Sequence, residues 1–143
     1  MKPLWLIAAV LTGVCVTNAA AAQTASDNWT VTSTGAADNP DDADRQVIAQ
    51  LKAQGSDITK PTDVIFYLYF HTQAQAEALR GAVSALGFTV DIHQVDRPPA
   101  WTLVANKTMV PSETAIIDLS HRLTTLATSQ QGIYDGWEAA LVK

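Results

Sequence analysis

Along most of the chain, the spacing of the apolar residues alternates between the period of a helix and the period of a strand. The first regular pattern places Val47, Ile48 and Leu51 at helical spacing and ends just before Gly55, a residue type that commonly follows the last turn of a helix. An acidic stretch precedes the pattern and suits the positive end of a helix dipole. These signals predict a first helix over residues 42–54.

The segment 63–70 is dense in β-branched and aromatic residues and has the clearest strand pattern of the chain. Strict alternation divides its apolar side chains between one face with Val64, Phe66, Leu68 and Phe70 and another face with Ile65, Tyr67 and Tyr69. Because both faces are apolar, we expect a central strand that is covered on each side. The first helix is the expected cover for the face that holds Tyr67 and Tyr69.

The rest of the chain continues to alternate between helices and strands. Thr72 and Gln75 form a capping box at the start of a second helix, which Gly87 ends. The patterns that follow predict strands over 88–93 and 101–110, a helix between Ser112 and Gly132, and a short strand over 133–138. The resulting order, βαββαβ, predicts an α+β fold of the ferredoxin-like type, with an antiparallel sheet, two helices on one face and one extra N-terminal helix.

Residues 1–22 have the pattern of a secretory signal peptide. Lys2 gives a positive start, residues 4–16 are apolar and uncharged, and Ala20–Ala22 offers small residues for cleavage before Gln23.

Two other uses of this leader are less favoured. A retained signal anchor would need roughly 20 apolar residues to span a bilayer, and a lipoprotein would need a small residue before Cys15, where Val14 stands. We therefore expect a cleaved leader, a flexible acidic linker over residues 23–41 and one domain over residues 42–143. The protein is expected to be periplasmic or secreted and to meet the membrane only transiently, through its signal peptide.

The charge balance is acidic, with 9 Lys and Arg residues against 14 Asp and Glu residues and a net charge of −5. Loss of Lys2 with the leader leaves eight basic residues against the same fourteen acidic ones, a net charge of −6. Binding of nucleic-acid phosphates needs several clustered Lys or Arg residues, and the sequence has no such cluster. The charge favours a protein partner with a basic surface and argues against direct nucleic-acid binding.

The residues that usually carry catalysis or bind metals are sparse. Cys15 is the single cysteine and lies in the leader, and His71, His93 and His121 do not have the spacing of metal ligands on one element. No nucleophile elbow and no glycine-rich phosphate loop is present. We therefore expect no metal, no cofactor and no enzymatic activity.

Three segments, in this order along the chain, resemble the RraB family of regulators of ribonuclease E activity. They are Gln-Leu-Lys-Ala-Gln-Gly-Ser-Asp at 50–57, Val-Ile-Phe-Tyr-Leu-Tyr-Phe at 64–70 and Tyr-Asp-Gly-Trp-Glu at 134–138. The resemblance implies a ferredoxin-like fold and a non-enzymatic inhibitor that binds the ribonuclease and not RNA. Together with the leader, it leads us to expect a protein-binding or inhibitory module outside the cytoplasm. Two alternatives stay open: a cytoplasmic inhibitor of ribonuclease E, and a small ligand-binding or hydrolytic ferredoxin-like protein.

The chain end supplies the best candidates for contact with a partner. Trp and Tyr side chains are efficient contacts in protein interfaces, and neighbouring acids would suit a basic partner. The candidate partner-binding residues are Tyr134, Asp135, Trp137, Glu138 and, after the Pro98–Pro99 break, Trp101. The structural alternative is that Trp137 anchors the last strand to the core and that Gly136 supplies a bend.

Overall fold

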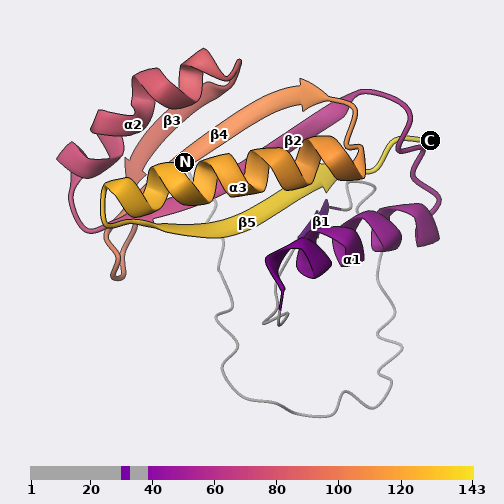
Figure 1. The fold of residues 1–143 in the computed structure, drawn as a ribbon, viewed down its shortest axis with the longest axis horizontal. Coiled ribbons are helices and arrows are strands. Elements are labelled where there is room, and N and C mark those ends of the chain that lie inside the picture. Colours follow the sequence, from indigo (N-terminus) through magenta and orange to yellow (C-terminus); the bar gives the residue numbers. More distant parts are fainter. Residues whose placement is uncertain (1–29, 33–38) are drawn as a thin grey trace, which may run out of the picture.

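The computed structural model describes residues 30–32 and 39–143. Within these residues the elements follow in the order β1 (Thr30–Thr32), α1 (Pro40–Ala53), β2 (Thr62–Phe70), α2 (Gln73–Ala85), β3 (Thr89–Gln94), β4 (Trp101–Met109), α3 (Glu113–Ser129) and β5 (Ile133–Ala140) (Figure 1).

The strands form one antiparallel sheet in the order β1-β5-β2-β4-β3. β2 is central: it pairs with β4 from Thr62, opposite Met109, to Phe70, opposite Trp101, and its other edge pairs with β5. β4 lies between β2 and β3, the two strands that α2 connects, which is the split βαβ arrangement. The predicted α+β, ferredoxin-like order with an extra N-terminal helix is therefore confirmed.

Side-chain caps fix where the helices begin. Thr72 and Gln75 form the predicted capping box of α2, in which the Thr72 hydroxyl accepts a hydrogen bond from the main-chain N–H of Gln75 at 3.3 Å. Ser112 caps α3 as predicted. α1 begins at Pro40, two residues earlier than expected, because the Asn39 side chain accepts a hydrogen bond from the Asp41 amide and proline suits the first helical position.

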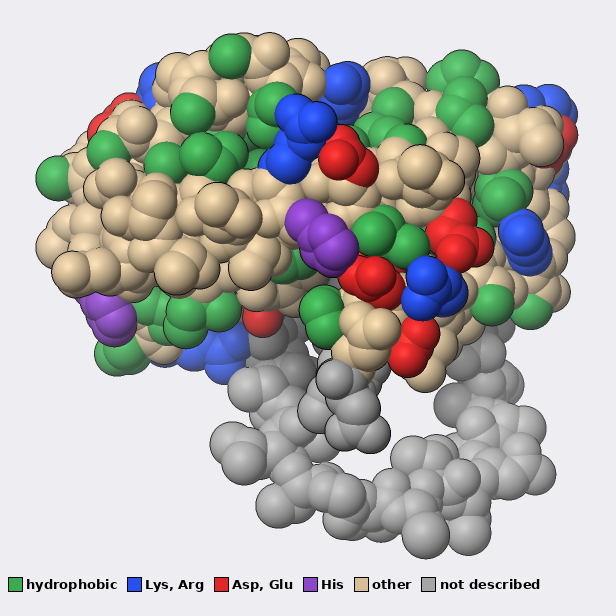
Figure 2. Space-filling view, viewed as in Figure 1, with side chains coloured by type: hydrophobic (Ala, Val, Ile, Leu, Met, Phe, Trp, Pro, Cys, Tyr) green, Lys and Arg blue, Asp and Glu red, His purple; other side chains and the backbone are tan. Residues whose placement is uncertain are grey.

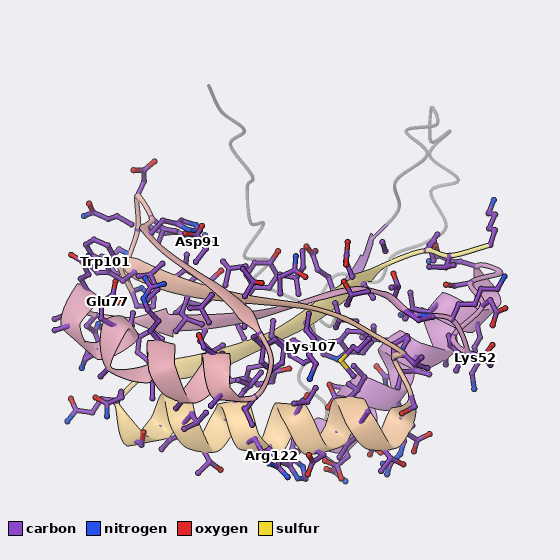
Figure 3. The ribbon with its side chains drawn as sticks, turned by 90° about the horizontal axis from the view of Figure 1, so that it is seen from above. Lys52, Glu77, Asp91, Trp101, Lys107 and Arg122 are labelled. Atoms are coloured by element: carbon purple, nitrogen blue, oxygen red, sulfur yellow. The ribbon has the colours of Figure 1, made fainter. Side chains whose placement is uncertain are left out.

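All three helices lie on the same side of the sheet (Figure 3). The core between sheet and helices includes the fully buried side chains of Leu51, Val64, Phe66, Leu68, Phe70, Val83, Leu103, Ile116, Leu123 and Trp137. The expectation that the first helix covers the face with Tyr67 and Tyr69 is wrong, since the buried residues of α1 belong to this same core. α1 packs beside α3 because its apolar stripe of Val47, Ile48 and Leu51 is buried in the core that also holds Ile116 and Leu123 of α3.

A β-bulge interrupts the pairing of β5 with β2. Tyr67 lies opposite Gly136 and Leu68 lies opposite Tyr134, so Asp135 is the extra residue of β5. Gly136 has φ 119°, a value that side chains with a Cβ rarely adopt. The bulge puts Tyr134 and Trp137 on the same side of the sheet although they are three residues apart.

The short strand β1 lies within the stretch that was expected to be a linker. It pairs with β5, with Thr30 opposite Ala140 and Thr32 opposite Glu138. At least these residues of the stretch 23–41 are therefore part of the sheet, and this corrects the expectation of an irregular linker throughout. The predicted signal peptide, residues 1–22, lies outside the described residues.

Candidate partner-binding face

The side of the sheet opposite the helices is the best candidate site, and we call it the open face. The strand register places on it Asp63, Ile65, Tyr67 and Tyr69 of β2, Thr102, Val104, Asn106 and Thr108 of β4, Thr89, Asp91 and His93 of β3, and Ile133 and Glu138 of β5. An antiparallel sheet with one solvated face usually carries mainly polar side chains there. Here the middle of that face is apolar and aromatic, which is more typical of an interaction surface.

Tyr67 stands at the centre of the open face and is held by β5. Its hydroxyl donates to Glu138 Oε1 at 2.6 Å, in the short range of charge-assisted hydrogen bonds. Partial burial, and next the hydrogen bond and charge of Glu138, raise the pKa of the Tyr67 phenol far above its usual range. The phenol therefore stays protonated at any physiological pH, and its ring has a fixed orientation on the sheet.

Tyr69 lies two residues further along β2, beside the bulge. Partial burial, together with the negative charge of Asp135, raises the pKa of the Tyr69 phenol, and the Arg97 guanidinium opposes that shift. Ile133 pairs with Tyr69 and is 58% exposed, the largest exposure among the large hydrophobic residues of the described part of the chain. Tyr69, Ile133 and Asp135 thus place an aromatic ring, an aliphatic side chain and a carboxylate close together.

Acidic residues border this aromatic centre. The Asp63 carboxylate accepts a hydrogen bond from the Thr108 hydroxyl at 2.6 Å. Asp91 Oδ2 lies 3.4 Å from Nδ1 of the His93 ring. No strand residue between 62 and 140 that the register places on the open face is Lys or Arg.

The basic residues lie mainly on the helix side. Lys52, Lys107 and Arg122 project on the side that carries the helices (Figure 3), and on that side Lys and Arg alternate with Asp and Glu (Figure 2). Lys107 is held there by a 2.8 Å hydrogen bond to the Leu86 carbonyl and by the Phe88 ring. The two sides of the sheet therefore differ in charge.

A buried polar cluster joins α1, α3 and β5 on the helix side. Asp44 is 4% exposed, and its Oδ1 accepts from the Trp137 indole Nε1 at 2.8 Å. Burial raises the pKa of the Asp44 carboxyl, and hydrogen bonds from Ser120 and Trp137 oppose that shift. The Ser120 and Tyr134 hydroxyls lie 3.0 Å apart. This cluster holds the extra helix α1 against the core.

The structure divides the five predicted contact residues between two sides of the sheet. Trp137 is fully buried, stacks on Phe66 at 6.3 Å and contacts α1 through Asp44, so its side chain has no surface to offer a partner. Tyr134 and Trp101 pack against the same core and are partly buried.

Asp135 and Glu138 are on the other side of β5. Asp135 is exposed at the bulge, and Glu138 lies on the open face against Tyr67. The bulge separates these two acids from the aromatic residues of the same motif, so the motif does not form one contact surface. The partner-binding role of Asp135 and Glu138 stays a prediction.

Sequence reasoning missed two features, one on the open face and one in the buried cluster on the helix side. Tyr67 and Tyr69 were expected to be covered, because the pattern of β2 shows two apolar faces but not which one the helices occupy. Asp44 was overlooked, although it lies at helical spacing with Val47, Ile48 and Leu51 and so shares their buried stripe. That spacing was the signal that could have found it.

The described residues hold no group of three His, Cys, Asp or Glu side chains that could bind a metal ion. Between residues 40 and 143, no helix combines the length and apolar character needed to cross a membrane. The open face offers rings and carboxylates side by side on neighbouring strands, which suits a macromolecular surface.

A search of curated proteins gives no significant match. The family model described as "Regulator of ribonuclease activity B", RraB, matches residues 41–139, a range that runs from the first turn of α1 almost to the end of β5. The chain therefore belongs to the RraB family, a family of regulators that bind other proteins.

Proposed function

We propose that this protein is a non-enzymatic inhibitor that acts outside the cytoplasm by binding a protein partner. The observation that carries the proposal is the open face, where aromatic and aliphatic side chains lie on the solvent side of a two-layer domain. A contiguous group of aromatic and aliphatic side chains on a solvent-facing sheet surface is typical of a macromolecular contact site. Membership of a regulator family supports binding as the mode of action.

Two features of the sequence support a location outside the cytoplasm and a protein partner. The leader over residues 1–22 combines a positive start, an apolar run and small residues before Gln23. The acidic net charge disfavours nucleic acid and favours a basic protein surface.

The test begins with the chain expressed with its own leader. We expect an N-terminal residue near Gln23 in the exported fraction, and cross-linking of that fraction should give a discrete adduct with one other protein. An intact Met1 in the cytoplasm would overturn the proposed location.

A second measurement separates this proposal from the cytoplasmic alternative. Residues 23–143 are added in large molar excess to ribonuclease E, and cleavage of an RNA substrate is followed. We expect no inhibition, because the partner of the exported protein is a different one. Inhibition that rises with the amount of added chain would instead support regulation of ribonuclease E.

A further inference from the structure

We propose that the open face is the docking surface for an extended segment of the partner that carries Lys or Arg at alternate positions. This inference rests on the proposed function and adds to it the surface used and the chemistry of the segment that binds there.

The first step is the charge of the open face. Its aromatic centre is bordered on three strands by carboxylates, and its strand positions lack Lys and Arg. The bordering acids are Asp63, Asp91, Asp135 and Glu138. Arg97, in the turn between β3 and β4, is a basic residue whose charge acts on Tyr69 and Asp135 from the end of the sheet. A cationic segment is therefore complementary to this surface, and charge complementarity selects partners and speeds encounter.

The second step is the aromatic rings. Tyr67 and Tyr69 present half-buried rings to solvent, and Lys or Arg side chains bind favourably over such rings. The Tyr67 ring is held by its hydrogen bond to Glu138, so a cation over that ring also lies close to a carboxylate. Tyr69 pairs with Ile133 beside the bulge, and the carboxylate of the bulge residue Asp135 is close enough for its charge to act on the Tyr69 phenol. The open face thus repeats one unit, a ring beside an acid, at two positions.

The third step is the spacing of these two units. Tyr67 and Tyr69 are separated by one residue of β2, so their side chains leave the strand about 7 Å apart. Alternate side chains of any extended segment have this same separation. A segment in a strand-like conformation, with basic residues at positions i and i+2, matches both units at once.

Other occupants fit less well. Residues 23–38 of this chain contain two Asp and no Lys or Arg, so the acidic border would repel them. A second copy placed face to face would bring the same carboxylates together, and the phosphates of RNA would meet them directly. A basic protein segment is the occupant that the charges favour.

The first experiment uses a labelled peptide in which Arg alternates with Thr, together with the chain from residue 23 to 143. Binding is followed by fluorescence anisotropy. The face variant is Asp91→Lys with Asp135→Lys, and the matched control is Glu77→Lys with Asp118→Lys, which changes the net charge equally on α2 and α3. Circular dichroism checks that both variants fold.

We expect the face variant to bind about tenfold more weakly and the control to stay within about twofold of the parent. A peptide that groups its Arg residues in one block should bind more weakly than the alternating one, and single-stranded RNA should not bind. Equal loss in both variants would overturn the proposal, and so would absence of peptide binding, equal binding of the block peptide or preferred binding of RNA.

A second experiment separates failure of the docking surface from failure of the proposed function. A photo-crosslinking amino acid replaces either Ile133 on the open face or Arg122, an exposed residue of α3, in the exported chain. An adduct from position 133, reduced in the face variant, supports the docking surface. An adduct only from position 122 overturns the docking surface but agrees with the proposed function, and no adduct from either position contradicts both.

Discussion

Replacing Trp137 with Phe and Asp44 with Ala, singly and together, measures how strongly their hydrogen bond holds α1 against β5. The indole Nε1 donates to the Asp44 carboxylate at 2.8 Å, and both side chains are buried. Phe keeps most of the ring that stacks on Phe66 at 6.3 Å but has no donor for the carboxylate. The substitution therefore tests the hydrogen bond more than the packing.

The magnitude follows from the burial of the pair. A hydrogen bond to a charged group contributes about 1.5–3 kcal/mol, and the smaller ring adds a packing loss, so we expect Trp137→Phe to cost about 2–4 kcal/mol. Asp44→Ala should cost about 1–3 kcal/mol, because the buried indole N–H loses this acceptor. Both single substitutions remove the same hydrogen bond. The unfolding free energy of the double variant should therefore be about 1.5 kcal/mol higher than the sum of the two single losses predicts.

Urea unfolding followed by far-ultraviolet circular dichroism is the appropriate assay, since Trp137→Phe removes one of the four tryptophans and alters the fluorescence signal. Thermal unfolding gives a second reading, in which Trp137→Phe should lower Tm by roughly 10 °C or more. A coupling energy below about 0.5 kcal/mol would refute the argument, because independent sites are additive within that margin. Packing alone would then explain the buried tryptophan.

Three further predictions concern single positions. Gly132→Ala should destabilise the fold by about 2–4 kcal/mol in urea unfolding, because its Cβ would collide with the Phe70 ring of β2. Gly81→Ala is the control: a Cβ at position 81 would have nothing within 4 Å, so this substitution should stabilise α2 by up to about 1 kcal/mol. Tyr67→Phe should cost about 1 kcal/mol, because the phenol no longer donates to Glu138; an unchanged urea midpoint would contradict a contribution of this hydrogen bond to stability. Burial raises the pKa of the Asp44 carboxyl in the folded protein above its ordinary value of 3.8. The protonated carboxyl therefore stabilises the fold below pH 3.8, and this contribution is lost as the pH rises through the raised pKa. Because Asn resembles the protonated carboxyl, the free energy of unfolding of Asp44→Asn relative to the parent should be higher at pH 7 than at pH 4. The same difference in unfolding free energy at both pH values would contradict that shift.

Local signals were sufficient to predict most of the secondary structure. The Thr72 capping box and the Ser112 cap give the starts of two helices, because a cap depends only on residues within one turn. The alternation in β2 identifies a central strand for the same reason. Short-range patterns of this kind determine the βαββαβ order and therefore the fold class.

Features that depend on distant residues were not predicted. The side of the sheet that α1 occupies depends on Asp44 meeting Trp137, which lies 93 residues further along the chain. The strand β1 pairs with β5 across nearly the whole domain, and its three residues have no pattern of their own. Long-range pairing of this kind leaves almost no trace in any single segment.

The bulge in β5 explains why the motif at 134–138 suggested a contact surface that the fold does not form. A regular strand would place Tyr134, Gly136 and Glu138 on one face and Asp135 and Trp137 on the other. The extra residue changes this alternation, so that both aromatic side chains enter the core while Glu138 reaches Tyr67 on the open face. Gly136, with φ 119°, allows the change in direction.

β5 consequently contributes to both sides of the sheet. Trp137 fixes the strand to α1 and to the core, and the next residue, Glu138, orients the Tyr67 ring on the opposite side. A loss of the Asp44–Trp137 hydrogen bond would loosen the strand that positions Glu138 and Asp135, whereas charge reversal at Asp91 and Asp135 would leave that hydrogen bond in place. The two kinds of variant should therefore separate: the first lowers stability and binding together, and the second lowers binding alone.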